Sequence, residues 1–147
     1  MKKNYLTALL AATTFILSTG CRKNNHSMIA GRYEHAELPG QTFEFGAENR
    51  YVNTVQAGLT NCTIDYTGTW TVNKDSLIVN MSAEPPRYHF GKDVTKEQQA
   101  YVRKLAEKMN NKRSSRMAFR IAGTDSTAVS LEQNGKIMTY TRIKSLK

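Results

Sequence analysis

Several signals are scarce in this chain of 147 residues, and each shortage excludes a class of protein. Two cysteines, Cys21 and Cys62, are too few for a disulfide-based scaffold. There is no Gly-x-Ser-x-Gly element and no glycine-rich phosphate loop, so we expect no catalytic residue and a protein that is not an enzyme. His26, His35 and His89 lack a second ligand at a metal-binding spacing, so we expect neither a metal site nor a cofactor.

No apolar run in the chain is long enough to span a membrane, which takes about 20 residues. The longest run, from Tyr5 to Gly20, has 16 residues and is interrupted by Thr and Ser. It follows Met1-Lys2-Lys3 and ends in small residues, and this charged, apolar and small-residue order is typical of a secretory signal. The sequence therefore predicts a signal peptide at residues 1–20 rather than a transmembrane anchor.

The signal ends in Leu-Ser-Thr-Gly followed by Cys21, which resembles the lipobox of bacterial lipoproteins. In that family lipid is attached to the cysteine thiol and the chain is cut just before it, and Ser18 stands here where the family usually has Leu. The resemblance implies acylation of Cys21, with palmitate among the chains, and a place in the bacterial cell envelope. Because no acidic run follows Cys21, we expect attachment to the outer membrane facing the periplasm. The alternative is an ordinary signal cut nearby, with Cys21 as a free thiol.

The 127 residues after the signal are enough for one domain with a core but not for two. We expect residues 21–28 to form a lipidated flexible tether and residues 29–147 to form the domain. If Cys21 carries lipid, Cys62 has no disulfide partner. We expect Cys62 to be buried as a small apolar residue rather than exposed as a reactive thiol.

Basic residues are concentrated in the C-terminal part of the chain. From Lys96 onward there are 12 Lys or Arg and 4 Asp or Glu, whereas residues 21–95 contain 7 and 8. A basic part of this kind can contact anionic headgroups or an acidic partner protein. Nucleic acid is a poor candidate because an exported protein does not normally meet it. The chain also lacks the interleaved aromatic and basic residues of single-strand binders.

Most of the domain consists of short segments in which apolar and polar residues alternate, as in half-buried antiparallel strands. The clearest segment, Thr63 to Val72, places its apolar residues on one face and its threonines on the other. Gly68 in its middle predicts a bend that lets a sheet curl. Turn signals such as Asn134-Gly135 separate the segments. The other seven predicted strands are Ile29 to His35, Gln41 to Phe45, Arg50 to Gln56, Ser76 to Ser82, Arg116 to Ala122, Thr127 to Gln133 and Lys136 to Ile143.

One long connection, from Glu84 to Ser115, carries an amphipathic helix at about residues 93–112. Asp93 or Thr95 can cap it, and Gln98 completes a weak capping box with Thr95. We expect the helix to be a lid or plug on the sheet with a solvated basic face, and membrane contact through that face is the alternative. The expected apolar face comprises Val94, Tyr101, Val102, Leu105 and Met109, and the basic face comprises Lys104, Lys108 and Lys112.

Eight sequential strands must protect their edges, and closure into a barrel does so completely. The predicted fold is therefore mainly β, an eight-stranded antiparallel up-and-down barrel with one inserted α-helix that covers one mouth or one side. The interior of such a barrel holds either side chains alone or one small ligand. An open two-sheet sandwich is the alternative.

Several short motifs have a familiar order: Gly31-Arg32-Tyr33 at the first strand, Phe43-Glu44-Phe45 ending the second, Gly-Thr-Trp-Thr-Val from Gly68, and Arg142 in the last strand. Over most of residues 28–144 the chain resembles the lipocalin-like, calycin-type small lipoproteins of Gram-negative envelopes. The resemblance implies that Tyr33 closes one end of the barrel beneath Arg142. Two features depart from the pattern: Tyr33 stands where the motif has Trp, and the helical insertion replaces a short turn.

The leading functional hypothesis is a lipid-anchored, non-enzymatic barrel that binds a small hydrophobic ligand, and the resemblance supports it by analogy. The alternative is an envelope adaptor or inhibitor that contacts a partner protein through its basic C-terminal part, without a small ligand. Whether the barrel has a cavity or a solid core is left open by the sequence. The candidate cavity residues are His35 at the mouth and the inward-pointing Phe43, Phe45, Tyr66, Trp70, Met81, Met117 and Phe119.

Overall fold

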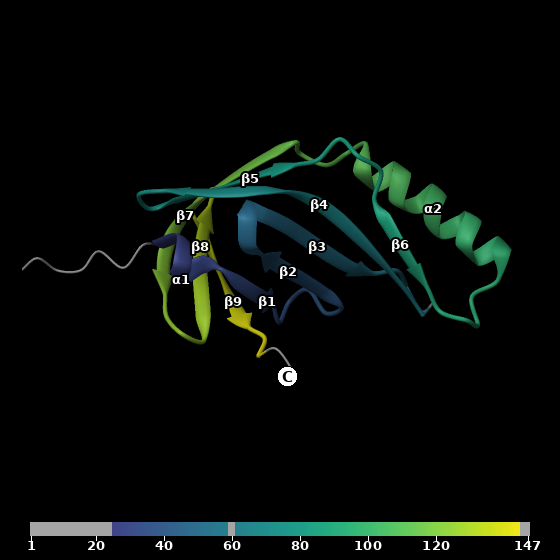
Figure 1. Cartoon of the computed structure of the whole chain (residues 1–147), viewed down its shortest axis with the longest axis horizontal. Helices are drawn as coiled ribbons and strands as arrows, with labels where there is room; N and C mark the ends of the chain where they lie inside the picture. Colours follow the sequence, from purple (N-terminus) through teal and green to yellow (C-terminus); the bar gives the residue numbers. More distant parts are fainter. Residues whose placement is uncertain (1–24, 59–60, 145–147) are drawn as a thin grey trace, which may run out of the picture.

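The computed structural model describes residues 25–58 and 61–144 (Figure 1). Within these residues no helix has the length and apolar character needed to cross a membrane. The elements are α1 (Asn25–Ile29), β1 (Gly31–Glu34), β2 (Gln41–Phe45), the 3-10 turn η1 (Ala47–Asn49), β3 (Arg50–Gln56), β4 (Cys62–Asn73), β5 (Ser76–Met81), β6 (Arg87–Phe90), α2 (Lys96–Asn110), β7 (Arg116–Thr124), β8 (Ala128–Gln133) and β9 (Lys136–Arg142).

Eight of the strands form a closed antiparallel barrel, as the alternation predicts. Their order around the ring is β1-β2-β3-β4-β5-β7-β8-β9, and pairing of β9 with β1 closes it. Short hairpins join most neighbours, and the Asn134-Gly135 turn has positive φ at both residues (53° and 77°), as a tight two-residue hairpin requires. The predicted fold class is confirmed, and the sandwich alternative is wrong.

A ninth strand, β6, was not predicted. The segment around His89 belongs to the connection from Glu84 to Ser115, where only a helix was predicted, but it pairs with the first residues of β4, from Cys62↔Phe90 to Asp65↔Arg87. This part of β4 has no bond to β5, which pairs with β4 only from Gly68 onward. Without β6 the edge of β4 would present unpaired backbone groups, so tertiary context rather than local pattern makes this segment a strand.

Gly68 marks the point at which β4 changes its partner on one edge. A side chain at this position would overlap the carbonyl oxygen of Asn80 on β5, so only glycine allows the two backbones to approach this closely. The glycine predicted to bend the strand is therefore needed for the close approach of β4 and β5. On the N-terminal side of Gly68, the first half of β4 extends beside β6 toward α2 (Figure 1).

The inward face of β4 contributes to two separate cores. Trp70, near the end of the strand, belongs to the barrel core together with Tyr33 and Leu77. Cys62 and Ile64, near its start, belong to a second core beneath α2. The helix thus covers the part of the inward face that extends past the barrel, which agrees with the expected lid on one end of the sheet. Cys62 is buried there, as predicted, and this burial raises the pKa of its thiol.

The helix has the predicted cap, but only Val94 and Val102 of the predicted apolar face are buried. The hydroxyl of Thr95 accepts a hydrogen bond from the Gln98 backbone N–H, and the Gln98 side chain accepts one from the Thr95 N–H. Val102 and Ala106 are buried against the sheet, since a small alanine permits close approach. The other large apolar residues of the expected face lie outside the contact: Tyr101, Leu105 and Met109 are 69%, 39% and 43% exposed.

The boundary between tether and domain also differs from the prediction. Residues 25–28, expected to be part of the flexible tether, form α1 with Ile29, and β1 begins only at Gly31. Ile29 is fully buried in the barrel core, which holds this short helix against one end of the barrel. The predicted signal peptide at 1–20 and Cys21, the predicted site of acylation, lie outside the described residues.

Candidate ligand-binding site

One end of the barrel is closed by the guanidinium of Arg142, which binds the chain as it leaves α1. Its Nη1 donates a hydrogen bond to the carbonyl of Ala30 and its Nη2 to that of Met28, both at 2.7 Å. The last carbonyls of a helix have no partner within the helix, so these bonds satisfy groups that would otherwise be unpaired. Arg142 thereby ties β9 to α1, more than 100 residues away in sequence.

Tyr33 completes this closure. Its hydroxyl donates to the carbonyl of Ile29 and accepts from Arg142 Nη2, both at 2.7 Å, and the guanidinium lies 5.0 Å from the ring centroid. Burial raises the pKa of this hydroxyl, and the positive charge of Arg142 opposes the rise. Gly31 has φ of +152°, and a Cβ there would lie 2.7 Å from Arg142 Nη1. The Gly-x-Tyr motif therefore provides both room and a partner for Arg142.

Trp70 fills the barrel next to this closed end. Its Nε1 donates to the carbonyl of Gly46 at 3.0 Å, and the His26 ring stacks on it with a centroid separation of 4.1 Å. His26, expected in the tether, thus covers the tryptophan. On the other side, the edge of Phe45 meets Trp70 at 5.4 Å. These rings pack inside the barrel beside α1 and form a floor for the space above them.

Above this floor the barrel has a cavity of about 260 Å³. Alternation along six strands directs the lining side chains inward, and most of them are apolar, as in small-ligand sites. The cavity settles the question that the sequence left open, because the core of the barrel is not solid. The lining residues are Gln41, Phe43 and Phe45 of β2, Tyr51 and Asn53 of β3, Val79 of β5, Met117 and Phe119 of β7, Leu131 and Gln133 of β8, Met138 and Tyr140 of β9, and the loop residues Leu38 and Arg113.

The cavity wall contains a few polar groups at defined places. Asn53 is only 5% exposed, and its Oδ1 accepts a hydrogen bond from Nε2 of Gln41 at 3.0 Å. Tyr51 contributes a hydroxyl whose pKa is raised by burial and lowered, to a smaller extent, by the nearby Arg113. A mainly apolar wall with few fixed polar groups both encloses and orients a ligand.

Arg113 reaches the cavity from the turn that follows α2. Its guanidinium carbon lies 3.6 Å from the centroid of the Tyr66 ring, in a cation–π contact. Among residues 25–58 and 61–144, no carboxylate forms an ion pair with Arg113. It is therefore a half-buried positive charge that a ligand can reach.

Four of the eight candidate cavity residues line the cavity: Phe43, Phe45, Met117 and Phe119. The other four do not. Tyr66 packs beneath α2, Trp70 lies at the closed end, and Met81 packs against both cores. His35, expected at the mouth, is buried with its ring 5.1 Å from that of Tyr140, which lines the cavity.

Sequence reasoning missed the lining residues of β3 and β9 and the basic residue after the helix. Alternation along β3 places Tyr51, Asn53 and Val55 on one face, so this signal was available. No local signal marks Arg113 as a cavity residue, because its place depends on how α2 packs. Lys104, Lys108 and Lys112 are all exposed, as expected for a solvated face.

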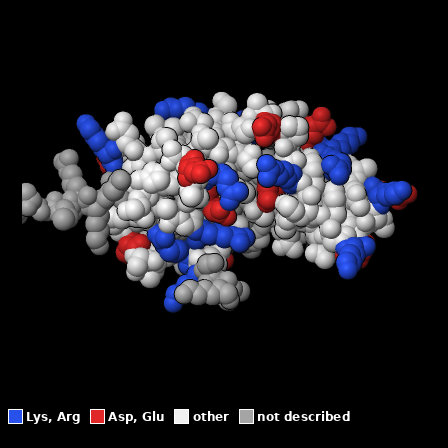
Figure 2. Space-filling view, in the orientation of Figure 1, with Lys and Arg blue, Asp and Glu red and all other residues white. Residues whose placement is uncertain are grey.

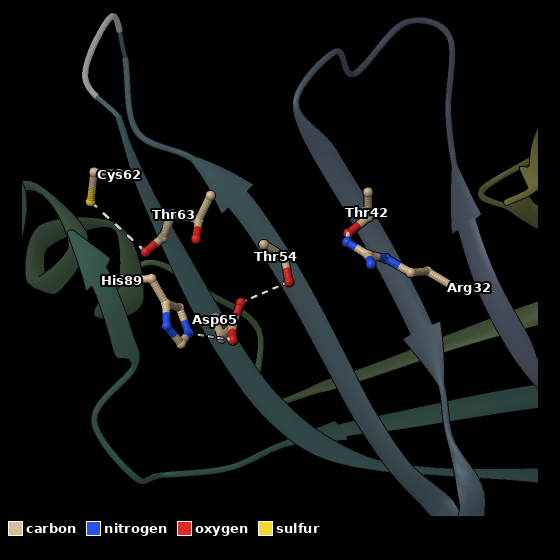
Figure 3. A network of polar contacts seen from close by, with 7 residues as sticks. All are labelled: Arg32, Thr42, Thr54, Cys62, Thr63, Asp65 and His89. Atoms are coloured by element: carbon tan, nitrogen blue, oxygen red, sulfur yellow. Dashed lines mark hydrogen bonds and ion pairs between the residues drawn. The ribbon is translucent and has the colours of Figure 1, made fainter. Parts of the chain in front are cut away.

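A second group of polar residues lies on the outer face of β3, β4 and β6 (Figure 3). The Thr54 hydroxyl donates to Asp65 Oδ1 at 2.7 Å, and His89 Nε2 lies 2.9 Å from Asp65 Oδ2. A hydrolase triad needs the histidine between the acid and the hydroxyl. Here the carboxylate is in the middle, so His89 cannot take a proton from Thr54, and the group joins three strands instead. No cluster of three metal-ligating side chains occurs among the described residues.

No family model and no curated protein matches the chain. Solved structures resemble it, among them two from Bacteroides species. The first is a lipocalin-like protein from Bacteroides uniformis ATCC 8492, with 11% identity and a TM-score of 0.49 over 78% of this chain and 97% of that chain. The second is an uncharacterized protein from Bacteroides eggerthii DSM 20697, with 9% identity and a TM-score of 0.50 over 78% and 98%. The second likeness shows a shared fold.

The closed end provides a direct test of its hydrogen bonds. Tyr33→Phe removes the partner of Arg142 and of the Ile29 carbonyl, so we expect the free energy of unfolding to fall by about 1–3 kcal/mol. Urea unfolding followed by the fluorescence of Trp70, the single tryptophan, measures the change. Tyr101→Phe, at a position 69% exposed, is the matched control and changes stability by less than about 0.5 kcal/mol. Equal losses in the two variants would contradict the assigned role.

Proposed function

We propose that this protein is a non-enzymatic binding protein that holds one small hydrophobic or amphipathic ligand inside its barrel. The observation that carries the proposal is the cavity of about 260 Å³. Its volume is near the lower end of the range for ligand pockets, about 300–1,000 Å³, so the ligand is small. The calycin-type resemblance in sequence agrees with this function, and no described group of residues has the geometry of a hydrolytic site.

The proposal predicts that a larger side chain in the cavity weakens ligand binding. Met138→Trp enlarges a half-buried lining residue, and we expect it to weaken binding of octanoate or 1-octanol at least about tenfold. Isothermal titration calorimetry on the mature, unlipidated protein measures affinity and a 1:1 stoichiometry. Met109→Trp makes the same change on the exposed face of α2 and leaves binding unchanged. If neither probe binds the wild-type protein, ligand binding in the barrel is wrong.

We also propose that Cys21 is acylated and anchors the protein to a membrane of the cell envelope, with the outer membrane facing the periplasm as the expected location. Cys21 is four residues before Asn25, a distance of at most about 14 Å along a fully extended chain, so the anchor is close to α1. Because α1 lies at the closed end, the barrel is attached by that end, and α2 lies at the other end of the long axis (Figure 1). The cavity mouth then faces away from the membrane.

Lipid anchoring predicts a change of compartment in a single variant. Cys21→Ser removes the acylated thiol, and we expect the protein to move from the membrane fraction to the soluble or unprocessed pool. Fractionation followed by immunoblotting measures the distribution. Ser18→Leu restores the usual lipobox residue and leaves the protein in the membrane fraction. A Cys21→Ser protein that stays processed and membrane-bound excludes this anchor.

A second candidate function is contact with an acidic envelope partner through α2. The observation that favours it is the exposed stripe of Tyr101, Leu105 and Met109 at successive turns of the helix. From Lys96 to Arg113 the chain has six basic and two acidic residues. Figure 2 shows blue basic side chains over the end of the molecule that carries α2. An apolar stripe beside lysines is suited to a partner with an apolar patch and acidic rim.

In-cell photo-cross-linking tests this second function. A photoreactive residue at Leu105 is expected to give one discrete adduct, which is lost when Lys104, Lys108 and Lys112 are changed to Glu. The same residue at Asn134, on the β8–β9 turn, gives no adduct and is the control. Absence of an adduct at Leu105, or an adduct that survives the three charge reversals, excludes the lysine face as the contact surface.

A further inference from the structure

We propose that the ligand is an amphipathic anion, with its negatively charged head bound by Arg113 at the mouth and its apolar tail directed toward Phe45. This inference rests on the proposed function and adds the charge and the orientation of the ligand. A carboxylate or another oxyanion on a short apolar chain or single ring is the chemical class that fits.

The first argument is the unbalanced charge of Arg113. Arg113 lines the cavity and its guanidinium is held against the Tyr66 ring at 3.6 Å, but it forms no ion pair with any carboxylate of the described residues. Stacking on a ring face leaves the edge of the guanidinium, with its N–H donors, free to bind an anion. A planar guanidinium binds a carboxylate through two parallel hydrogen bonds, which are among the strongest in proteins.

The second argument is that other donors line the same cavity. Asn53 uses its Oδ1 to accept from Gln41, and its amide nitrogen remains as a donor on the cavity wall. Tyr51 lines the cavity and lies near enough to Arg113 for the charge to act on its hydroxyl. In Arg113, Asn53 and Tyr51 together, the groups left to bind a ligand include more donors than acceptors. Donors of this kind are complementary to a negatively charged ligand oxygen.

The third argument is the gradient of polarity along the cavity. The floor consists of aromatic rings, with Phe45 in edge contact with Trp70 at 5.4 Å. The cations lie elsewhere: Arg142 is used at the closed end, and Arg113 enters from the turn after α2. A charged head at the floor would lose its hydration without compensation, whereas a tail there loses none. Only one orientation of an amphipathic anion satisfies both ends.

A matched pair of probes tests the proposal on the wild-type protein. Octanoate and 1-octanol have the same chain length and differ at the head group, and at pH 7 only octanoate is charged. A purely apolar cavity prefers octanol, because burial of an unpaired carboxylate is costly. We expect the opposite order in calorimetric titrations, with octanoate bound at least about tenfold more tightly.

Substitution then assigns the preference to one residue. Arg113→Gln removes the charge but retains hydrogen-bonding groups, and we expect it to weaken octanoate binding about tenfold while octanol affinity stays within about twofold. Lys112→Gln makes the same change of charge on the neighbouring exposed residue and leaves both affinities unchanged. Arg113→Lys keeps the charge without the planar fork and gives an intermediate affinity for octanoate.

The outcomes separate this inference from the function on which it rests. Equal or tighter binding of octanol by the wild-type protein overturns the anion preference but leaves ligand binding intact. Binding of neither probe overturns ligand binding itself. Loss of both affinities in a folded Arg113→Gln protein shows that Arg113 only supports the Tyr66 ring, and this also contradicts the proposal. The comparison of octanoate with 1-octanol uses only the wild-type protein. It therefore tests the anion preference even if Arg113→Gln does not fold.

Discussion

The architecture depends on the way in which β4 is shared between two partners along one edge. Before Gly68 this edge pairs with β6, and from Gly68 onward it pairs with β5, so one continuous inward face serves two cores. The face beyond the barrel needs a cover, and α2 provides it through Val102 and Ala106. Because the helix is occupied there, it does not fill the barrel, and the turn after it brings Arg113 to the mouth. The extension of β4 past the barrel therefore determines where α2 packs, and the position of α2 determines where Arg113 lies.

The two ends of the barrel use their arginines in opposite ways. Arg142 donates three hydrogen bonds through its two terminal nitrogens, to the carbonyls of Met28 and Ala30 and to the Tyr33 hydroxyl. Arg113 has only a ring beside it and no carboxylate among the described residues. Neither arginine has a carboxylate partner among the described residues, so the difference lies in the hydrogen bonds: the terminal nitrogens of Arg142 bind protein acceptors, whereas those of Arg113 are left to bind an anion. This asymmetry distinguishes the closed end from the end at which we propose that the ligand binds.

Local pattern predicts the strands but not how far along the barrel each residue lies. The predicted bounds of β2, Gln41 to Phe45, agree with the structure because alternation and flanking turns are local signals. The β6 segment has no such signal, since its strand forms only where β4 needs a partner. Alternation also places Tyr66 and Trp70 on the inward face, but it cannot tell that α2 and α1 cover them. The buried amide of Asn53 is hydrogen-bonded by Gln41 on the neighbouring strand. Such a pair joins two separate segments, so the pattern within either segment cannot predict it.

Methyl NMR of the methionines, recorded as octanoate is added, tests the central claim most directly. Met117 and Met138 line the cavity, whereas Met28 lies at the closed end and Met109 on the exposed face of α2. A ligand inside the barrel shifts the resonances of Met117 and Met138 with one saturable affinity and leaves those of Met28 and Met109 in place. Shifts confined to Met109, or no shift at Met117 and Met138, would contradict binding in the barrel.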